Sequence, residues 1–120
     1  MIHQWKIDTI TGNTSGTTSR PLSGRLLAVY VEYAITPNVA TDVVIATVNA
    51  PVKTILTITN NVTNGWFYPR AQVQDETGAD VLYAATFGVH EPVPVADYIK
   101  ATVAQGDTDQ TLDVWLLIEE

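Results

Sequence analysis

The segment RLLAVYVEYAI, residues Arg25 to Ile35, carries the strongest strand pattern in the chain. Successive side chains of a strand point to opposite faces, so its residues divide into two sets. One face collects Leu27, Val29, Val31, Tyr33 and Ile35, and the other collects Leu26, Ala28, Tyr30 and Ala34. Because both faces are apolar apart from Glu32, we expect a central strand, or a strand whose second face meets a partner.

Shorter segments on both sides of this strand alternate in the same way, and turn residues separate them. Asn64-Gly65 is a strong hairpin signal, because both residues tolerate positive φ. No connection is long enough for a series of parallel crossovers, which favours antiparallel pairing. The pattern predicts an all-β fold, an antiparallel β-sandwich of about eight strands that is jelly-roll-like. The expected strands besides the first are residues 5–10, 41–48, 53–59, 66–74, 80–84, 98–104 and 112–119.

The last of these strands has an aliphatic face and a mixed face. Leu112, Val114, Leu116 and Ile118 share the first, and Trp115 lies on the second. We expect the aliphatic face to fill the core. Residues 86–94, with Gly88, Pro92 and Pro94, are expected to be irregular.

The region before the strongest strand is polar and rich in turn-forming residues. Residues 11–24 consist of Gly, Asn, Ser, Thr, Arg and Pro with Leu22 as the one apolar member. We expect residues 1–24 to form an N-terminal strand and a flexible, extended polar arm that orders on a partner. Residues 25–120 are expected to form the β-sandwich, so that the chain is a single domain overall.

Composition excludes several classes of protein. The 120 residues contain no cysteine, which rules out a disulfide scaffold or a thiolate metal site. The net charge of −7 argues against nucleic acid as a partner, since phosphate contacts need Lys and Arg. Charged residues make up only 16% of the chain against 46% hydrophobic, so we expect part of the surface to be covered. Neither a signal peptide nor an apolar stretch long enough to span a membrane is found, which predicts a soluble protein made in the cytoplasm.

Residues that could carry catalysis are few and scattered. The two histidines, His3 and His90, are far apart, and the serines (Ser15, Ser19 and Ser23) all lie in the polar arm. His90 and Glu91 provide two ligands, too few for a zinc site. Carboxylate pairs such as Asp75 with Asp97, or Glu91 with Glu119, have no spacing that singles them out as a glycosidase pair. We therefore expect no enzyme activity and no cofactor.

Two groups of acidic residues lie in predicted turns. Alternating carboxylates can bind calcium, but here the spacing of an EF-hand and its closing glutamate are missing. Asp also stabilises tight turns by bonding to nearby backbone N–H groups, and this explanation is sufficient. We expect no metal, with calcium as the alternative left open. The two groups are Asp107, Asp109 and Asp113, and Asp75, Glu76 and Asp80.

The aromatic run Trp66-Phe67-Tyr68 is the best candidate for a contact surface. Along a strand these three side chains alternate, so at least one points away from the core. Exposed Trp and Tyr are enriched at protein interfaces and also stack on sugars. The alternative is that two lie in the core and a loop covers the third. The predicted partner-binding residues are Trp66, Tyr68, Arg70, His90 and Tyr30.

Several segments between Ser23 and Glu119 carry a resemblance to a known group of proteins. They are residues 24–30 (GRLLAVY), 64–70 (NGWFYPR) continuing through 72–75 (QVQD), 92–100 (PVPVADYIK) and 103–107 (VAQGD). In these segments the chain resembles small virion structural proteins of tailed bacteriophages. These are similarities of local sequence pattern that cover most of the chain, and they contain no diagnostic motif.

The resemblance implies a capsid decoration or cement protein that binds the major capsid protein on the capsid surface of the virion. Proteins of this kind are typically β-rich and frequently homotrimers, and they have no active site whose residues could be carried over. The alternative function is a receptor- or carbohydrate-binding module of a phage tail or head fibre. That function would use Trp66, Tyr68 and the loop of residues 86–94.

Overall fold

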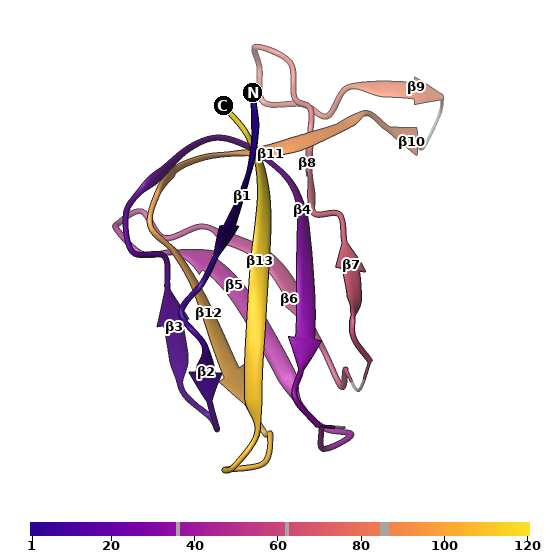
Figure 1. The fold of residues 1–120 in the computed structure, drawn as a ribbon. Coiled ribbons are helices and arrows are strands. Elements are labelled where there is room, and N and C mark those ends of the chain that lie inside the picture. The colour runs from indigo at the N-terminus through magenta and orange to yellow at the C-terminus, as the bar shows by residue number, and fades with distance from the viewer. Residues whose placement is uncertain (36, 62, 85–86) are drawn as a thin grey trace.

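The computed structural model describes residues 1–35, 37–61, 63–84 and 87–120, with the side chain of Tyr83 left out. The chain is all-β, and thirteen strands are found in the described residues. Two antiparallel sheets face one another, and a two-stranded hairpin projects from one end (Figure 1). The sequence therefore predicts the fold class and the antiparallel pairing correctly. The count of about eight strands is not reproduced, and the jelly-roll arrangement stays a prediction.

The larger sheet has the order β1-β13-β4-β11-β8, with β2 added to β13 and β7 added to β4. Its centre is the pairing of β4 with β13, which runs from Leu112 opposite Tyr33 to Glu119 opposite Arg25. The strands are β1 (Ile2–Lys6), β2 (Ile10–Thr11), β4 (Leu22–Tyr33), β7 (Gly65–Phe67), β8 (Arg70–Gln72), β11 (His90–Asp97) and β13 (Thr111–Glu119).

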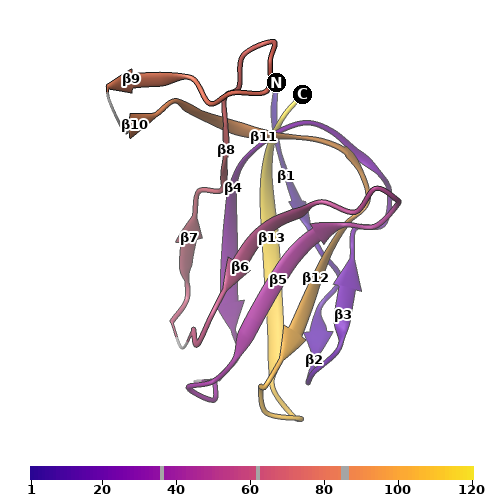
Figure 2. The same ribbon diagram turned by 180° about the vertical axis from the view of Figure 1, so that it is seen from behind.

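The smaller sheet lies behind the larger one, as Figure 2 shows from the back, and has the order β3-β12-β5-β6. Its strands are β3 (Ser15–Thr17), β5 (Asp42–Thr47), β6 (Thr54–Ile58) and β12 (Ile99–Ala104). The projecting hairpin consists of β9 (Leu82–Ala84) and β10 (Phe87–Gly88).

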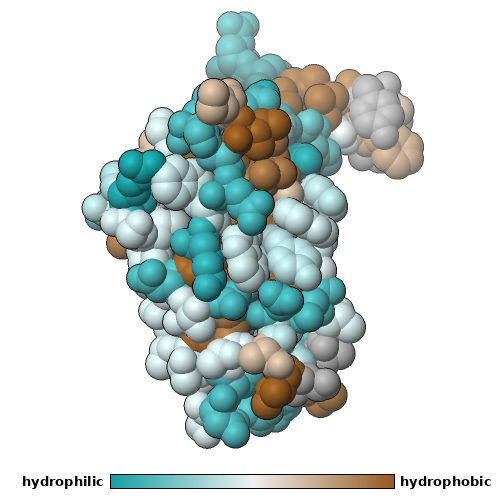
Figure 3. Space-filling model, in the orientation of Figure 1, coloured by the Kyte–Doolittle hydropathy of each residue, from teal (hydrophilic) through white to brown (hydrophobic). Residues whose placement is uncertain are grey.

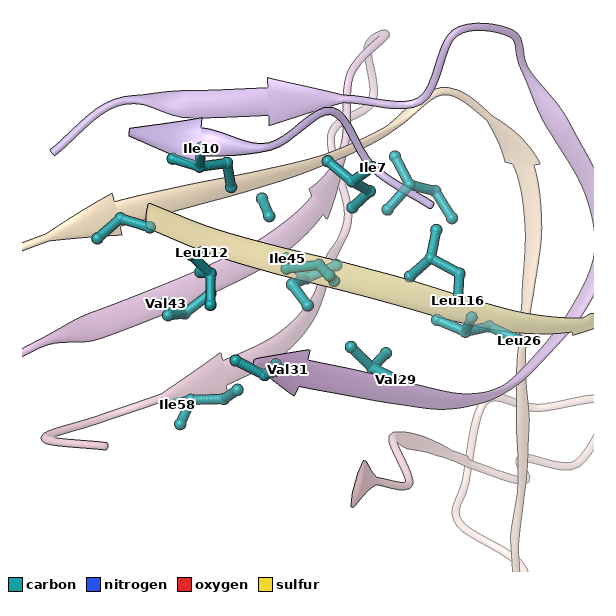
Figure 4. Packing of buried hydrophobic residues seen from close by; sticks show 14 of the residues in the cluster. Ile7, Ile10, Leu26, Val29, Val31, Val43, Ile45, Ile58, Leu112 and Leu116 are labelled. Atoms are coloured by element: carbon teal, nitrogen blue, oxygen red, sulfur yellow. The ribbon is translucent and has the colours of Figure 1, made fainter. Parts of the chain in front are cut away.

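The core fills the space between the two sheets. Leu26, Val29 and Val31 of β4 and Leu112 and Leu116 of β13 extend from one sheet. They meet aliphatic side chains of the other sheet and of the segment after β1 (Figure 4). The aliphatic face of β13 is buried as predicted, with Leu116 fully inaccessible. The facing side chains are Val43, Ile45 and Ile58, and Ile7 and Ile10, which lie beside β13, belong to the same cluster.

Two positions of the strongest strand differ from the sequence prediction. The register of β4 against β13 shifts between Leu117 and Ile118, which lie opposite Ala28 and Leu26, so Leu27 is an extra residue. This bulge reverses the alternation, and Leu26 enters the core in place of Leu27. Ile35 lies beyond the end of β4 and is 55% exposed.

Proline explains two further differences. The predicted strand of residues 66–74 is divided into β7 and β8 around Pro69, which has no N–H to donate to a neighbouring strand. β11 begins inside the predicted irregular region and runs through Pro92 and Pro94. Each of these prolines lies opposite only one paired strand, since Pro92 faces Arg70 of β8 and Pro94 faces Arg25 of β4.

The polar segment predicted to be a flexible arm is part of the sandwich in the structure. β3 pairs with β12, and Val103 donates its backbone N–H to the carbonyl of Thr14 at 2.9 Å. Thr18 is buried and exchanges hydrogen bonds with Ile99. A Cβ at Gly16 would clash with the backbone oxygen of Asp8, so the segment packs too closely there for any larger residue. Sequence reasoning misses this pairing because edge-strand pairing needs backbone groups, not apolar side chains.

Asp97 anchors the corner where the chain passes from β11 in one sheet to β12 in the other. Its carboxylate accepts hydrogen bonds from the backbone N–H of Asn49 at 2.8 Å, the side-chain amide of Asn49 at 2.8 Å and the N–H of Tyr98 at 2.6 Å. Partial burial acts to raise the pKa of Asp97, but these hydrogen bonds together outweigh it and hold the pKa below its ordinary value.

Replacing Leu116 by alanine should cost about 2–5 kcal/mol of unfolding free energy, because it leaves a cavity between the sheets. Trp115→Ala should cost less, since that ring lies on the outer face. Urea melts of both variants test this order. A larger loss for Trp115→Ala would mean that the outer face carries more of the stability.

The backbone N–H groups of Thr18 and Val103 should exchange slowly with solvent in the isolated protein, because both are bonded across β3 and β12. Amide exchange followed by NMR measures this directly. Exchange as fast as that of an unstructured peptide would restore the flexible arm.

Acid should weaken the corner at Asp97. A carboxyl whose pKa is depressed by folding stabilises the protein above its unfolded pKa of about 3.9, and this contribution is lost as the pH falls through the lower folded pKa. Urea melts between pH 7 and pH 2 should show a smaller loss of stability below about pH 4 in Asp97→Asn than in the wild type. An identical pH profile in the two proteins would contradict this account.

Candidate binding surface on the larger sheet

Four side chains form a row across the outer face of the larger sheet. Lys6 of β1 lies opposite Trp115 of β13, Trp115 lies opposite Tyr30 of β4, and Tyr30 lies opposite Trp66 of β7. The ring centres of Tyr30 and Trp115 are 5.9 Å apart, and those of Tyr30 and Trp66 are 5.1 Å apart. Both pairs are tilted by just over 50°, so the three rings form one continuous aromatic surface.

The alternation of the strands explains why these rings point outward. Val29 and Val31, on either side of Tyr30, are buried, and so are Val114 and Leu116 on either side of Trp115. Trp66 is 47% exposed. Figure 3 views this face and shows pale and hydrophilic side chains at its centre, as expected for aromatic residues among polar ones.

The row forms one wall of a shallow groove of about 440 Å³, which we call the aromatic groove. Glu32 is the one charged side chain in its lining, and no hydrogen bond or ion pair to the Glu32 carboxylate is found among the described residues. Asp113 lies opposite Glu32, but it is bonded to Thr9 at 2.6 Å and to Lys6 at 3.3 Å. The lining residues are Gln4, Tyr30, Glu32, Trp66 and Trp115.

Tyr68 and Arg70 lie beyond Trp66 along the same segment. Tyr68 is 63% exposed, and the Arg70 guanidinium lies 6.0 Å from the centre of its ring. Arg70 also donates hydrogen bonds to the carbonyls of Leu27 at 2.9 Å and Pro69 at 2.8 Å. Arg70 therefore fixes the β7–β8 segment to β4, and Tyr68 is an exposed ring beside it.

The predicted site residues are thus only partly brought together. Tyr30 and Trp66 are in contact and Tyr68 and Arg70 are neighbours, whereas His90 lies on β11 opposite Gln72 and does not line the groove. The sequence prediction did not include Trp115, Gln4 or Glu32. The outward orientation of the Trp115 side chain can be predicted from its alternation with aliphatic residues. Its position beside Tyr30 follows only from the pairing of two strands that are distant in the sequence.

The acidic groups considered for calcium have other partners or are exposed. Asp75 accepts hydrogen bonds from the Thr77 hydroxyl and from the backbone N–H groups of Thr77 and Ala79. The Thr77 hydroxyl, followed by these two N–H groups, holds the pKa of Asp75 below its ordinary value. Asp107 and Asp109 are exposed. Within the described ranges, no group of three or more His, Asp or Glu side chains is placed to hold a metal ion.

The histidine and carboxylates considered for catalysis also contact other groups. His3 lies 3.4 Å from a carboxylate oxygen of Glu120. Glu119 forms an ion pair with Arg25, whose hydrogen bond and positive charge hold the pKa of Glu119 below its ordinary value. Each of these groups therefore has a structural contact that accounts for its place.

Comparisons with protein family models, with curated proteins and with solved structures found no match. Within the described residues, no helix is long and apolar enough to cross a bilayer. Inferences about function therefore rest on the surface chemistry of the larger sheet.

Proposed function

We propose that this chain is a non-enzymatic virion structural protein, most specifically a decoration or cement protein that binds and stabilises the shell of major capsid protein. The observation that carries the proposal is the aromatic row of Tyr30, Trp66 and Trp115 on the outer face of the larger sheet. Such a continuous aromatic surface suits docking on another protein, since Trp and Tyr are enriched among the residues that dominate the binding energy of interfaces.

Apolar burial outweighs ion pairing in this kind of contact. Burial contributes about 25 cal/mol per Å², and exposed ion pairs contribute only about 0–1 kcal/mol each and are screened by salt. Trp66 has the largest exposed area to lose among the three rings of the row, so we assign it as the anchor.

Attachment of this chain would stabilise the assembled shell by mass action, because the chain would bind the shell and not the separated capsid subunits. The chain would lie on the capsid surface of the virion after synthesis in the host cytoplasm. We also propose self-association, with a homotrimer as the expected state, which light scattering on the purified protein measures.

The strand pairing supports a jelly-roll-like arrangement. β4 pairs with β13 in the larger sheet, and β5 pairs with β12 in the smaller one. The chain that runs from β4 to β5 is therefore antiparallel to the chain that runs from β12 to β13. A long hairpin rolled across two sheets gives this pattern. Jelly rolls occur in viral capsid proteins and in lectins, so this arrangement is compatible with both candidate functions.

A specific observation favours the second candidate, a receptor- or carbohydrate-binding module of a phage tail or head fibre. The aromatic groove combines rings with the polar groups of Gln4 and Glu32, the combination that sugar sites use. Binding to a glycan array at protein concentrations up to millimolar would support this function. The absence of binding there would leave the decoration function as the better explanation.

Trp66→Ala should weaken attachment to particles markedly, whereas wild-type attachment should survive molar salt. Sedimentation of purified phage heads with added protein measures both effects. Val52→Ala is the matched control, because Val52 is an exposed apolar residue in the loop between β5 and β6. Release of the wild type by salt alone would show that acidic groups carry the binding. Electron cryomicroscopy that finds no copy of this chain on the capsid surface would overturn the proposed function.

A further inference from the structure

Cations lie over aromatic rings at several places on this protein. The Lys6 ammonium lies 5.5 Å from the ring centre of Trp115, and the Arg20 guanidinium lies 4.1 Å from that of Trp5. With Arg70 over Tyr68, three of the six Lys and Arg residues are used in this way. Such contacts are favourable because the faces of aromatic rings carry negative electrostatic potential.

Two of the three rings in the aromatic groove have no such cation over them. Among the described residues, no Lys or Arg lies over Tyr30 or Trp66. Glu32 lines the groove beside them, and no ion pair to it is found among the described residues, while Lys6 of the same row is paired with Asp113. The groove therefore combines aromatic faces with an uncompensated carboxylate.

A surface that covers the aromatic row must also cover Glu32. An ionised carboxylate that is buried without a partner is costly, so a docking surface gains little from the rings unless it also supplies a positive charge. A neutral ligand can donate hydrogen bonds to the carboxylate but does not offset its charge. The net charge of −7 also attracts positively charged partners at longer range.

We propose that the aromatic groove receives an arginine side chain of a partner protein, stacked on Tyr30 and Trp66 and paired with Glu32. This inference rests on the proposed function, in which the same face docks on a protein shell. Arginine fits better than lysine because its planar guanidinium stacks on rings and bonds a carboxylate through two N–H groups. Gln4 offers a further acceptor at the groove wall.

The test uses a capped Gly-Arg-Gly peptide as the probe and the same peptide with citrulline, which has nearly the same shape but no charge. The indole N–H signals of Trp66 and Trp115 in NMR spectra report binding. We expect saturable shifts at millimolar arginine peptide and at least about threefold weaker binding of the citrulline peptide. Equal binding of the two peptides would overturn the proposal, as would tighter binding of neutral sugars at the same signals.

Glu32→Gln should weaken arginine-peptide binding at least about threefold. Glu76→Gln is the matched control, because it removes the same charge from an exposed turn outside the groove. Equal losses in the two variants would show a general charge effect and overturn the proposal. Because Glu32 is exposed, both variants should give the circular dichroism spectrum of the wild type.

Sedimentation with phage heads separates this inference from the proposed function. Weaker attachment of Glu32→Gln than of Glu76→Gln supports both. If Trp66→Ala loses attachment and Glu32→Gln keeps it in full, the arginine site is wrong and the decoration function stands. If the wild type does not attach at all, the decoration function is wrong, and the peptide titration still decides whether the groove binds arginine.

Discussion

The pairing of β4 with β13 is the constraint on which the rest of this structure depends. It joins residues 22–33 to residues 111–119, so distant parts of the chain must meet to form the centre of the larger sheet. Each strand contributes one aliphatic face to the core and one face to the surface. Once the register is set, β1, β7 and β11 can add only at the remaining edges. The same register that buries Val29 and Leu116 also aligns Tyr30 with Trp115.

The sequence allows the fold class and the core face of β13 to be predicted, because the side-chain period of a strand is local. It does not reveal the bulge at Leu27, since an extra residue depends on how the partner strand is placed. The same holds for β3, where Gly16 and its neighbours pair through the backbone and leave no apolar pattern to detect. Pro92 and Pro94 suggest an irregular segment in the sequence, but a proline disrupts a strand only where its backbone N–H would be needed as a hydrogen-bond donor.

The binding surface could be predicted only as separate residues. Trp66 and Tyr68 stand out in the sequence as an aromatic run in a strand, and both are exposed. Trp115 and Gln4 become part of the same surface because β13 pairs with β4 on one side and with β1 on the other. These pairings join distant parts of the chain. The sequence prediction groups His90 with them, but the path of β11 carries it away from the groove. Residue type identifies candidates, and register decides which of them share a surface.

The corner at Asp97 has a consequence for how the protein comes apart. β11 ends at Asp97 in the larger sheet and β12 begins at Ile99 in the smaller one, with only Tyr98 between them. With so short a connection, the two sheets cannot separate while both strands stay paired, because opening one sheet pulls on the other. Unfolding is then a single cooperative event rather than the loss of one layer at a time. The core of this domain should therefore become exposed to water only together with the loss of its outer surface.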